Sequence, residues 1–339
     1  MFYLGGMGGS QDRGADSNRR GERLFELRRR TFDTPEFRGI EFIEVECKTI
    51  LNRVPGDGLP FNWTINPYRG CTHACSYCFA RATHPYLDLG AGRDFETKIL
   101  VKINAPEVLR AQLRSRRWKG EHVAMGTGTD PYQRAEGRYR LMPQLLEALI
   151  ERRNPFSILT KGVLILRDLP MLERAAAVAE ISTAFSIATL DEDVWRRAEP
   201  GTPHPRERMR AVRALNEAGI PCGVMLAPVM PGINDRPEQL RAVVEAAIDA
   251  GATHVSPILL HLRPTVREEY LAWLHAEYPD LVARHEAMYR RGAYAPRADR
   301  AKLAEDVGGL VAELGGVPDA RPRRARREPA AAPEQLTLL

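Results

Sequence analysis

Long apolar runs are missing from this sequence of 339 residues: none approaches the ~20 consecutive apolar residues that a membrane-spanning helix needs. The first residues also lack the apolar stretch of a secretory signal, so we expect a cytoplasmic protein. Only five cysteines are present, and the cytoplasm keeps thiols reduced. These absences argue against a membrane protein and against a small disulfide-stabilised domain.

A strong excess of one charge is missing as well. The net charge is +5, and much of the excess arginine lies near the two ends of the sequence. A basic balance fits a partner that carries phosphates, whereas arginine-rich ends can also serve only solubility. Composition therefore leaves the partner open, although 44% hydrophobic residues allow a sizeable core.

The periodic part of the sequence lies between two regions without sustained periodicity. Residues 1–36 are rich in glycine, arginine and aspartate and are predicted to be a mobile arm, with a short helix at 22–30. Residues 37–290 carry the periodic signal of a single α/β domain, and residues 291–317 are predicted to be a helical extension. Residues 318–339 are rich in proline, alanine and arginine, which predicts a disordered basic tether.

Short β-rich stretches alternate with amphipathic helical stretches about six times in the periodic part. This alternation is typical of parallel βα units, and it predicts a partial (β/α)6 TIM-like barrel. Reactive groups in such barrels lie at the carboxyl ends of the strands. The predicted strands are 62–66, 122–126, 156–160, 180–186, 222–229 and 253–260.

Three cysteines stand within eight positions, and no fourth cysteine is near them. Cys71, Cys75 and Cys78 have the spacing C-x3-C-x2-C. A structural zinc site usually has two separated pairs of ligands, so zinc would need His73 or His84 as a fourth ligand. A [4Fe-4S] cluster takes one thiolate per iron, and three cysteines leave one iron open. The pattern favours the cluster as the metal site.

The cysteine stretch resembles the signature of the radical S-adenosylmethionine (radical SAM) superfamily, C-x3-C-x-aromatic-C, with Tyr77 as the aromatic residue. The stretches NPYRGCTHACSYCFAR, GTGTDPYQ, LTKG, FSIAT and APVMPGIND resemble the branch related to spore photoproduct lyase, and within it actinobacterial members of unassigned reaction. The resemblance implies S-adenosylmethionine (SAM) bound at the open iron, a reducing electron donor, and cleavage of SAM to a 5′-deoxyadenosyl radical.

We further expect a nucleic-acid substrate, damaged DNA in the first place, a lyase-type and repair-like reaction, and a monomer. Two other functions stay open at this stage. One is a radical SAM enzyme that modifies RNA or a small metabolite. The other is a non-catalytic iron–sulfur protein that binds DNA.

Polar residues at successive predicted strand ends are the candidates for binding SAM, together with Tyr77. GTGTD stands where family members have a Gly-Gly-Glu-like stretch, and Lys161 offers an ammonium group for the SAM carboxylate. Alternatively, Thr127 and Asp130 are turn residues, Lys161 is solvated, and Ser186 is an ordinary strand hydroxyl. The candidates are Gly126, Thr127, Gly128, Thr129, Asp130, Lys161, Ser186 and Asn234.

The hydrogen donor of the related lyase is a cysteine near the end of the second strand, and HVAMGTGTD contains none. The remaining catalytic candidates are Tyr132, Tyr68 and Cys222. Two histidines have other predicted roles: His73 is a polar filler or a donor to a cluster sulfur, and His261 is a packing residue.

The final residues, QLTLL, resemble the bacterial peptide that binds the sliding clamp. In that peptide, the glutamine makes polar contacts and the leucines enter apolar pockets. Gln335, Leu336, Leu338 and Leu339 would make these contacts here, although five degenerate positions also arise by chance. A clamp-binding peptide would point to DNA.

Overall fold

The computed structural model describes residues 28–54 and 59–317. At its centre lies a sheet with the strand order β11-β10-β9-β8-β7-β4-β3. Neighbouring strands from β4 to β11 are parallel, and β3 is antiparallel to β4. The strands are β3 (Leu51–Arg53), β4 (Trp63–Ile65), β7 (Val123–Met125), β8 (Phe156–Thr160), β9 (Ile181–Ser186), β10 (Cys222–Val229) and β11 (Val255–Leu259).

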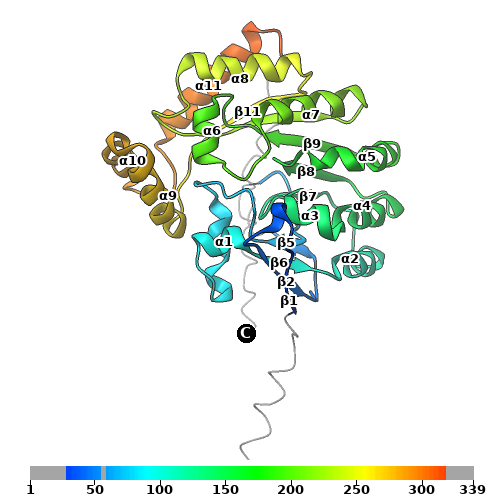
Figure 1. The fold of residues 1–339 in the computed structure, drawn as a ribbon. Helices are drawn as coiled ribbons and strands as arrows, with labels where there is room; N and C mark the ends of the chain where they lie inside the picture. Colours follow the sequence, from blue (N-terminus) through cyan, green and yellow to red (C-terminus); the bar gives the residue numbers. More distant parts are fainter. Residues whose placement is uncertain (1–27, 55–58, 318–339) are drawn as a thin grey trace, which may run out of the picture.

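The predicted partial (β/α)6 barrel is confirmed within the described residues, because each of the six predicted strand stretches contains one of the parallel strands. Figure 1 shows helices in an arc around the outside of this sheet. They connect successive strands, as parallel strands require. These helices are α2 (Ala105–Arg114), α3 (Arg134–Tyr139), α4 (Leu141–Glu151), α5 (Leu169–Ala176), α6 (Glu192–Ala198), α7 (Pro205–Glu217) and α8 (Pro237–Asp249).

Apolar side chains between the sheet and the helices form the main core. Leu145 and Leu149, one helical turn apart on α4, lie in this core with Phe156 and Ile158 of β8. Their spacing follows the 3.6-residue period of a helix and the two-residue period of a strand. Burial of each such side chain contributes about 1.5–3 kcal/mol, so the core fixes the strand ends on which the polar residues stand.

A second, smaller sheet has the order β1-β2-β6-β5 and was not predicted. Its β1 pairs antiparallel with β2, and β2 pairs in parallel with β6. The strands are short and several are rich in charge, which hides them from a search for apolar alternation. They are β1 (Arg28–Thr31), β2 (Glu41–Val45), β5 (Tyr68–Arg69) and β6 (Lys98–Lys102), with the short helix α1 (Arg93–Thr97) before β6.

The predicted arm of residues 1–36 and its helix at 22–30 differ from the structure where the structure describes them. Arg28–Thr31 is a strand, and Arg29 pairs with Glu41 across the sheet at 2.7 Å. Next to it, the ring of Phe32 lies 5.4 Å from that of Phe42. Cross-strand charge pairs and aromatic packing hold this edge strand although its own sequence is mostly arginine.

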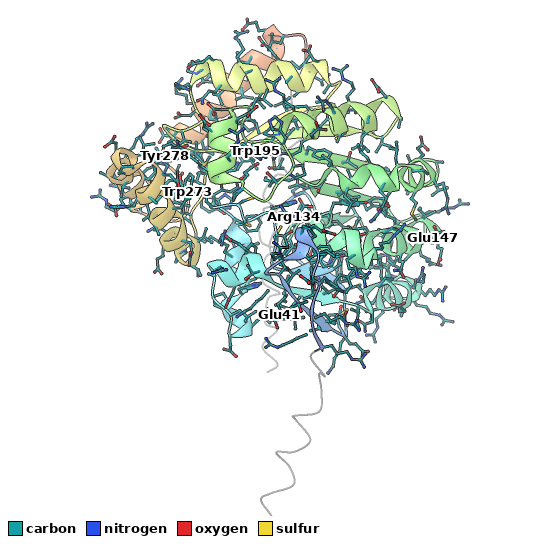
Figure 2. All side chains as sticks on the ribbon, in the orientation of Figure 1. Glu41, Arg134, Glu147, Trp195, Trp273 and Tyr278 are labelled. Atoms are coloured by element: carbon teal, nitrogen blue, oxygen red, sulfur yellow. The ribbon has the colours of Figure 1, made fainter. Side chains whose placement is uncertain are left out.

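The last described helices are α9 (Pro264–Glu277), α10 (Val282–Tyr289) and α11 (Arg297–Glu313). Helix α11 lies in the predicted extension 291–317 and packs against α8 and β11. Trp273 and Tyr278 lie together on the α9 side of the molecule, where Trp273 donates a hydrogen bond to the carbonyl of Arg197 in α6 (Figure 2).

No helix in residues 28–54 and 59–317 is both long and apolar enough to cross a membrane. The predicted tether 318–339 and its QLTLL stretch with Gln335, Leu336, Leu338 and Leu339 lie outside the described residues.

Candidate active site

A cavity of about 190 Å³ lies at the carboxyl ends of the parallel strands, where the turn after β7 and the strands β8 to β11 contribute residues to its wall. The cysteine loop closes the other side. Most of the sequence-predicted site residues are therefore brought together on one cavity. These are Cys71, Cys75, Tyr77, Cys78, Gly126, Thr127, Gly128, Thr129, Asp130, Lys161 and Ser186.

The cysteine loop begins directly after β5 with a glycine that the backbone requires. Gly70 has a φ of +80°, and a Cβ atom there would lie 2.9 Å from the carbonyl oxygens of Phe95 and Lys98. The next amide, that of Cys71, donates a hydrogen bond to the carbonyl of Phe95 at 2.9 Å. Only glycine fits this close approach, so Gly70 sets the point from which the loop enters the cavity.

Two buried polar side chains hold the loop in place, and neither was singled out from the sequence. The guanidinium of Arg81 donates two hydrogen bonds to the carbonyl of Cys75, at 2.9 and 3.1 Å. The amide of Gln133 accepts from the backbone N–H of Thr72 at 3.0 Å and donates to the carbonyl of Gly70 at 2.9 Å. Since irregular loops lack ladder hydrogen bonds, these side chains supply the partners that the buried backbone needs.

The three thiols are suited to binding a positively charged metal group. Burial raises the pKa of Cys71, Cys75 and Cys78, that of Cys75 to about 12. A buried thiolate without a cationic partner is unfavourable, whereas coordination to a metal deprotonates a thiol. Three such thiols on one cavity fit a cluster that takes one thiolate per iron.

Each of the two histidines that could serve a zinc site has one ring nitrogen in contact with an oxygen atom of the protein. The Nδ1 atom of His73 lies 3.4 Å from a carboxylate oxygen of Asp130, and Nε2 of His84 lies 3.1 Å from the carbonyl oxygen of Lys98. Among the described residues, no three His, Cys, Asp or Glu side chains converge on a single ion. A cluster does not require such convergence, because each of its irons takes its own thiolate.

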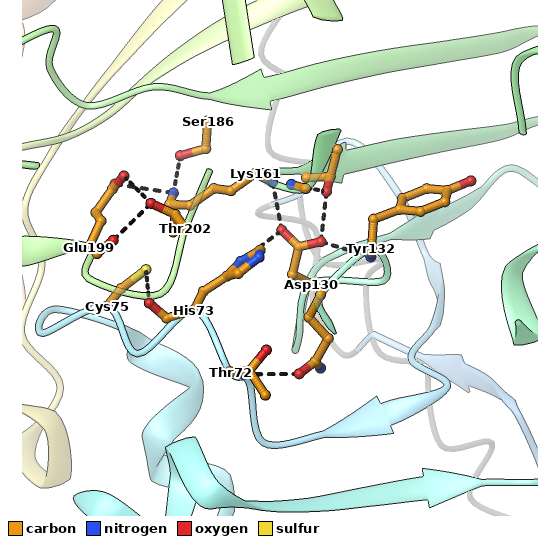
Figure 3. A network of polar contacts seen from close by, with 12 residues as sticks. Thr72, His73, Cys75, Asp130, Tyr132, Lys161, Ser186, Glu199 and Thr202 are labelled. Carbon is orange, nitrogen blue, oxygen red and sulfur yellow. Dashed lines mark hydrogen bonds and ion pairs between the residues drawn. The ribbon is translucent and has the colours of Figure 1, made fainter. Parts of the chain in front are cut away.

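Asp130 ties the strand ends to the cysteine loop (Figure 3). Its carboxylate accepts hydrogen bonds from the hydroxyl of Thr160 at 2.6 Å, the backbone N–H of Lys161 at 2.6 Å and that of Tyr132 at 2.8 Å. Burial disfavours its charged form, but His73 and these donors outweigh burial and lower its pKa. Asp130 is thus more than the turn residue that its sequence context also allowed.

The glycines of GTGTD are needed because a neighbouring strand lies close to them. Gly126 has a φ of +87°, and a Cβ atom there would stand 1.8 Å from the carbonyl oxygen of Leu159. The N–H of Gly128 donates to the side chain of Asn66 at 2.9 Å. The close approach of Gly126 brings the turn after β7 against the end of β8, and the hydrogen bond of Gly128 ties the same turn to the residue after β4.

Lys161 lies within a buried group of polar side chains that includes one residue missed from the sequence, Glu199 (Figure 3). The ammonium of Lys161 donates to the hydroxyl of Ser186 at 2.5 Å and lies 3.7 Å from Glu199. The hydroxyl of Tyr77 donates to Glu199 as well, and Arg208 pairs with it at 2.5 Å. The predicted alternative of a solvated lysine is therefore wrong.

Positive and negative charges do not balance within this group of polar side chains. Burial disfavours the ionised form of Glu199, yet Arg208 and Lys161 outweigh it and lower the pKa of Glu199 to about 2. One carboxylate therefore stands between two cations, which leaves one unit of positive charge. Lys161 lines the cavity and Arg208 is fully buried behind it. The excess positive charge is presented at Lys161, which suits a carboxylate ligand.

Asn234 is not part of the cavity, contrary to prediction. The side chain is 1% exposed, accepts from the N–H of Met230 at 2.6 Å and donates to the carbonyl of Ala188 at 2.7 Å. The loop after β10 turns back on itself, so this amide satisfies backbone groups instead of pointing to the rim.

The three predicted catalytic candidates also lie outside the cavity wall. Tyr68 donates its hydroxyl to Glu136 at 2.5 Å in the core. The ring of Tyr132 points away from Lys161 in Figure 3. Cys222 is buried at the start of β10, at the opposite end of that strand from the site. Sequence spacing predicted the strands near which these residues lie. It did not predict whether their side chains face the cavity or at which end of the strand they stand.

The missed residues lie at the ends of recognised motifs or outside them. Gln133 is the last residue of GTGTDPYQ, Arg81 follows Cys78 by three positions, and Glu199 and Arg208 stand on either side of the start of α7.

Comparison with known proteins gives two kinds of similarity. The Radical SAM superfamily matches residues 65–255 of this chain. An uncharacterized protein of Mycobacterium tuberculosis (strain ATCC 25618 / H37Rv) is 47% identical over 310 residues, which is 91% of each chain.

Solved structures of spore photoproduct lyase share the fold. One, in complex with dinucleoside spore photoproduct, superposes with a TM-score of 0.60 at 15% identity and covers 80% of this chain and 79% of that one. Another, a double mutant with bound AdoMet and dinucleoside spore photoproduct, gives a TM-score of 0.57 at 18% identity and covers 76% of each chain.

Proposed function

We propose that this chain, which belongs to the radical SAM superfamily, holds a [4Fe-4S] cluster on Cys71, Cys75 and Cys78 and binds SAM in the adjoining cavity. The superfamily implies both groups. The observation that carries the assignment of residues is that the three thiols share one cavity with Lys161 and Ser186.

Such a cluster supplies an electron for the reductive cleavage of SAM, which gives a 5′-deoxyadenosyl radical. The chain's own residues bind and orient. The ammonium of Lys161, next to the hydroxyl of Ser186, is placed to hold the SAM carboxylate. Met225, Ile258 and Leu260 contribute an apolar part of the wall, which limits water around a reactive species.

We further propose a nucleic-acid substrate, damaged DNA in the first place, and a lyase-type reaction. The support is the fold shared with spore photoproduct lyase, which was solved with a dinucleoside lesion, and the net charge of +5. The turn after β7 carries no cysteine, so the hydrogen donor of that lyase has no counterpart at this position. The proposal therefore extends to the substrate class and not to the lesion.

The test is an anaerobic assay of the full chain after reconstitution with iron and sulfide. Reduced protein should form 5′-deoxyadenosine from SAM, and UV-irradiated DNA should increase the yield above that with undamaged DNA. An increase with RNA alone would replace DNA as the substrate. Cluster-loaded, reduced protein that never cleaves SAM would contradict the enzyme proposal and favour a non-catalytic iron–sulfur protein.

A separate proposal rests on the sequence alone, namely that QLTLL binds the bacterial sliding clamp. A synthetic peptide of residues 328–339 should bind with a dissociation constant of roughly micromolar strength, because few residues carry the contact. Replacement of Gln335, Leu336 and Leu338 by alanine should abolish binding. A peptide that does not bind the clamp at tens of micromolar, about tenfold above that strength, would remove this argument for DNA.

A further inference from the structure

A row of three rings runs outward from the mouth of the cavity. Phe79, the residue after Cys78, and His261, which follows β11, both line the cavity. Their ring centroids are 5.8 Å apart, and the ring of Tyr294 stacks on His261 at 5.6 Å with an interplanar angle of 25°. The row thus joins the cluster loop to the segment between α10 and α11.

The two rings at the ends of the row are unusually exposed for large aromatic side chains. Phe79 is 40% exposed and Tyr294 57% exposed, whereas Tyr270 and Tyr289, on the helices α9 and α10 nearby, are buried. Exposed apolar surface that continues into a cavity is typical of a binding site. One face of Tyr294 is covered by His261, and the exposed parts of Phe79 and Tyr294 are available to a flat ligand that enters from the solvent.

Two arginines accompany the row. The guanidinium carbon of Arg263 lies 6.0 Å from the ring centroid of Phe79, and that of Arg300 lies 5.6 Å from the ring centroid of Tyr294. Neither makes an ion pair with a carboxylate of residues 28–54 or 59–317. Their positive charge remains free for an anionic ligand.

Flat aromatic faces next to uncompensated cations match the chemistry of an unpaired nucleotide. The base of a nucleotide stacks on aromatic rings, and the backbone phosphates pair with arginine. Burial and the nearby Arg263 lower the pKa of His261, so its ring stacks as the neutral imidazole.

We propose that Phe79, His261 and Tyr294 form a stacking row for an unpaired nucleobase at the mouth of the cavity, and that Arg263 and Arg300 hold the adjoining phosphates. This inference rests on the proposed nucleic-acid substrate and deepens it. Either the lesion or a neighbouring base stacks on the row. The row thereby positions a single strand, or a locally opened strand, above the site.

The test measures binding of a fluorescein-labelled, single-stranded oligothymidylate to the reconstituted full chain by fluorescence anisotropy. Tyr294→Leu should weaken binding roughly tenfold, because one base–aromatic stack is lost. Tyr294→Trp should keep wild-type affinity, since indole stacks at least as well. Val178→Ser, at an exposed apolar residue after α5, is the control that should leave binding unchanged.

Salt dependence tests the arginines independently. Arg263→Gln should reduce the slope of log affinity against log salt by about 0.7, the value of one phosphate contact on a single strand. Arg117→Gln, at an exposed arginine after α2, should leave the slope unchanged.

The outcomes separate this inference from the proposed function. Wild-type binding that Tyr294→Leu and Arg263→Gln leave intact would overturn the stacking row and leave a nucleic-acid substrate standing. A wild-type protein that cleaves SAM but binds no oligonucleotide would overturn both the substrate class and the row. Loss of affinity in Tyr294→Trp equal to that in Tyr294→Leu would also contradict stacking.

Discussion

Two buried glutamates, Glu199 and Glu136, have similar partners but opposite shifts in pKa. Glu199 accepts a hydrogen bond from the hydroxyl of Tyr77, and Glu136 accepts one from that of Tyr68. Each also pairs with an arginine. The pKa is nevertheless lowered for Glu199 and raised for Glu136.

The number and burial of the nearby cations explain the difference. At Glu199, the fully buried Arg208 and the ammonium of Lys161 together outweigh the effect of burial. At Glu136, burial outweighs the neighbouring donors and raises the pKa, because Arg167 is partly exposed and is shared with Asp168.

The two glutamates distinguish a polar network at the cavity from a polar network in the core. The network of Glu199 includes two side chains on the cavity wall, Tyr77 and Lys161, and it ends with excess positive charge. The carboxylate of Glu136 accepts hydrogen bonds from the backbone N–H groups of Leu141 and Met142 and fixes the start of α4. Changes in the first network should alter ligand binding, and changes in the second only stability.

The largest effect is expected at the cysteines on the cavity side. Cys71→Ala, Cys75→Ala or Cys78→Ala should each abolish the visible absorbance of the cluster and SAM cleavage, because no other described thiol lines the cavity. Cys222→Ala is the matched control, and both properties should persist in it. Reconstituted wild type that remains colourless and contains zinc would refute the cluster assignment.

The next largest effect is on stability. Glu199→Gln should lower the free energy of unfolding by about 3–5 kcal/mol, since it leaves Arg208 buried without a full negative partner. Glu136→Gln should cost less, about 1–3 kcal/mol, because Arg167 keeps Asp168. Urea unfolding of both variants and of wild type measures the difference, and equal costs would break the comparison.

The pH dependence sharpens this test. The lowered pKa of Glu199 gives stability that is present above its unfolded value near 4.3 and lost only as the pH falls toward about 2. The deficit of Glu199→Gln should thus be constant from pH 7 to about 5. The raised pKa of Glu136 means that the folded state binds the extra proton. Wild type gains stability as the pH falls through that raised pKa, so the deficit of Glu136→Gln should grow.

Local sequence patterns account for the part of the fold and of the candidate site that could be predicted. All six parallel strands followed from apolar periodicity, and the placement of the three cysteines and Lys161 on one cavity followed from spacing and position at strand ends. The edge strand Arg28–Thr31 was missed because its stability comes from Glu41 and Phe42, which are distant in sequence. Asn234 was misplaced because a turn residue carries no sign of which way its loop folds.

Lys161→Ala tests the cavity side without removing the cluster. The variant should bind SAM roughly tenfold or more weakly, because a charge-assisted contact to a carboxylate is lost. Lys98→Ala, at a lysine paired with Asp94 outside the cavity, is the control for loss of charge. Isothermal titration with reconstituted protein gives the affinities, and equal affinity in both variants would remove Lys161 from the site.

The smallest effects on SAM binding should come from the two tyrosine hydroxyls, and they compare the networks most directly. Tyr77→Phe and Tyr68→Phe each remove one donor from a buried carboxylate and keep the ring, so each should cost about 1.5–3 kcal/mol of stability. Only Tyr77 lines the cavity, next to Lys161.

Without the hydroxyl of Tyr77, we expect the carboxylate of Glu199 to interact more strongly with Lys161. This interaction draws the ammonium group of Lys161 away from the cavity. Tyr77→Phe should therefore weaken SAM binding by a few-fold, whereas Tyr68→Phe should keep the wild-type affinity. The same titration, together with urea unfolding of both variants, separates the two effects. Equal loss of SAM affinity in Tyr68→Phe would show that the core network reaches the cavity, and the division between site and core would then fail.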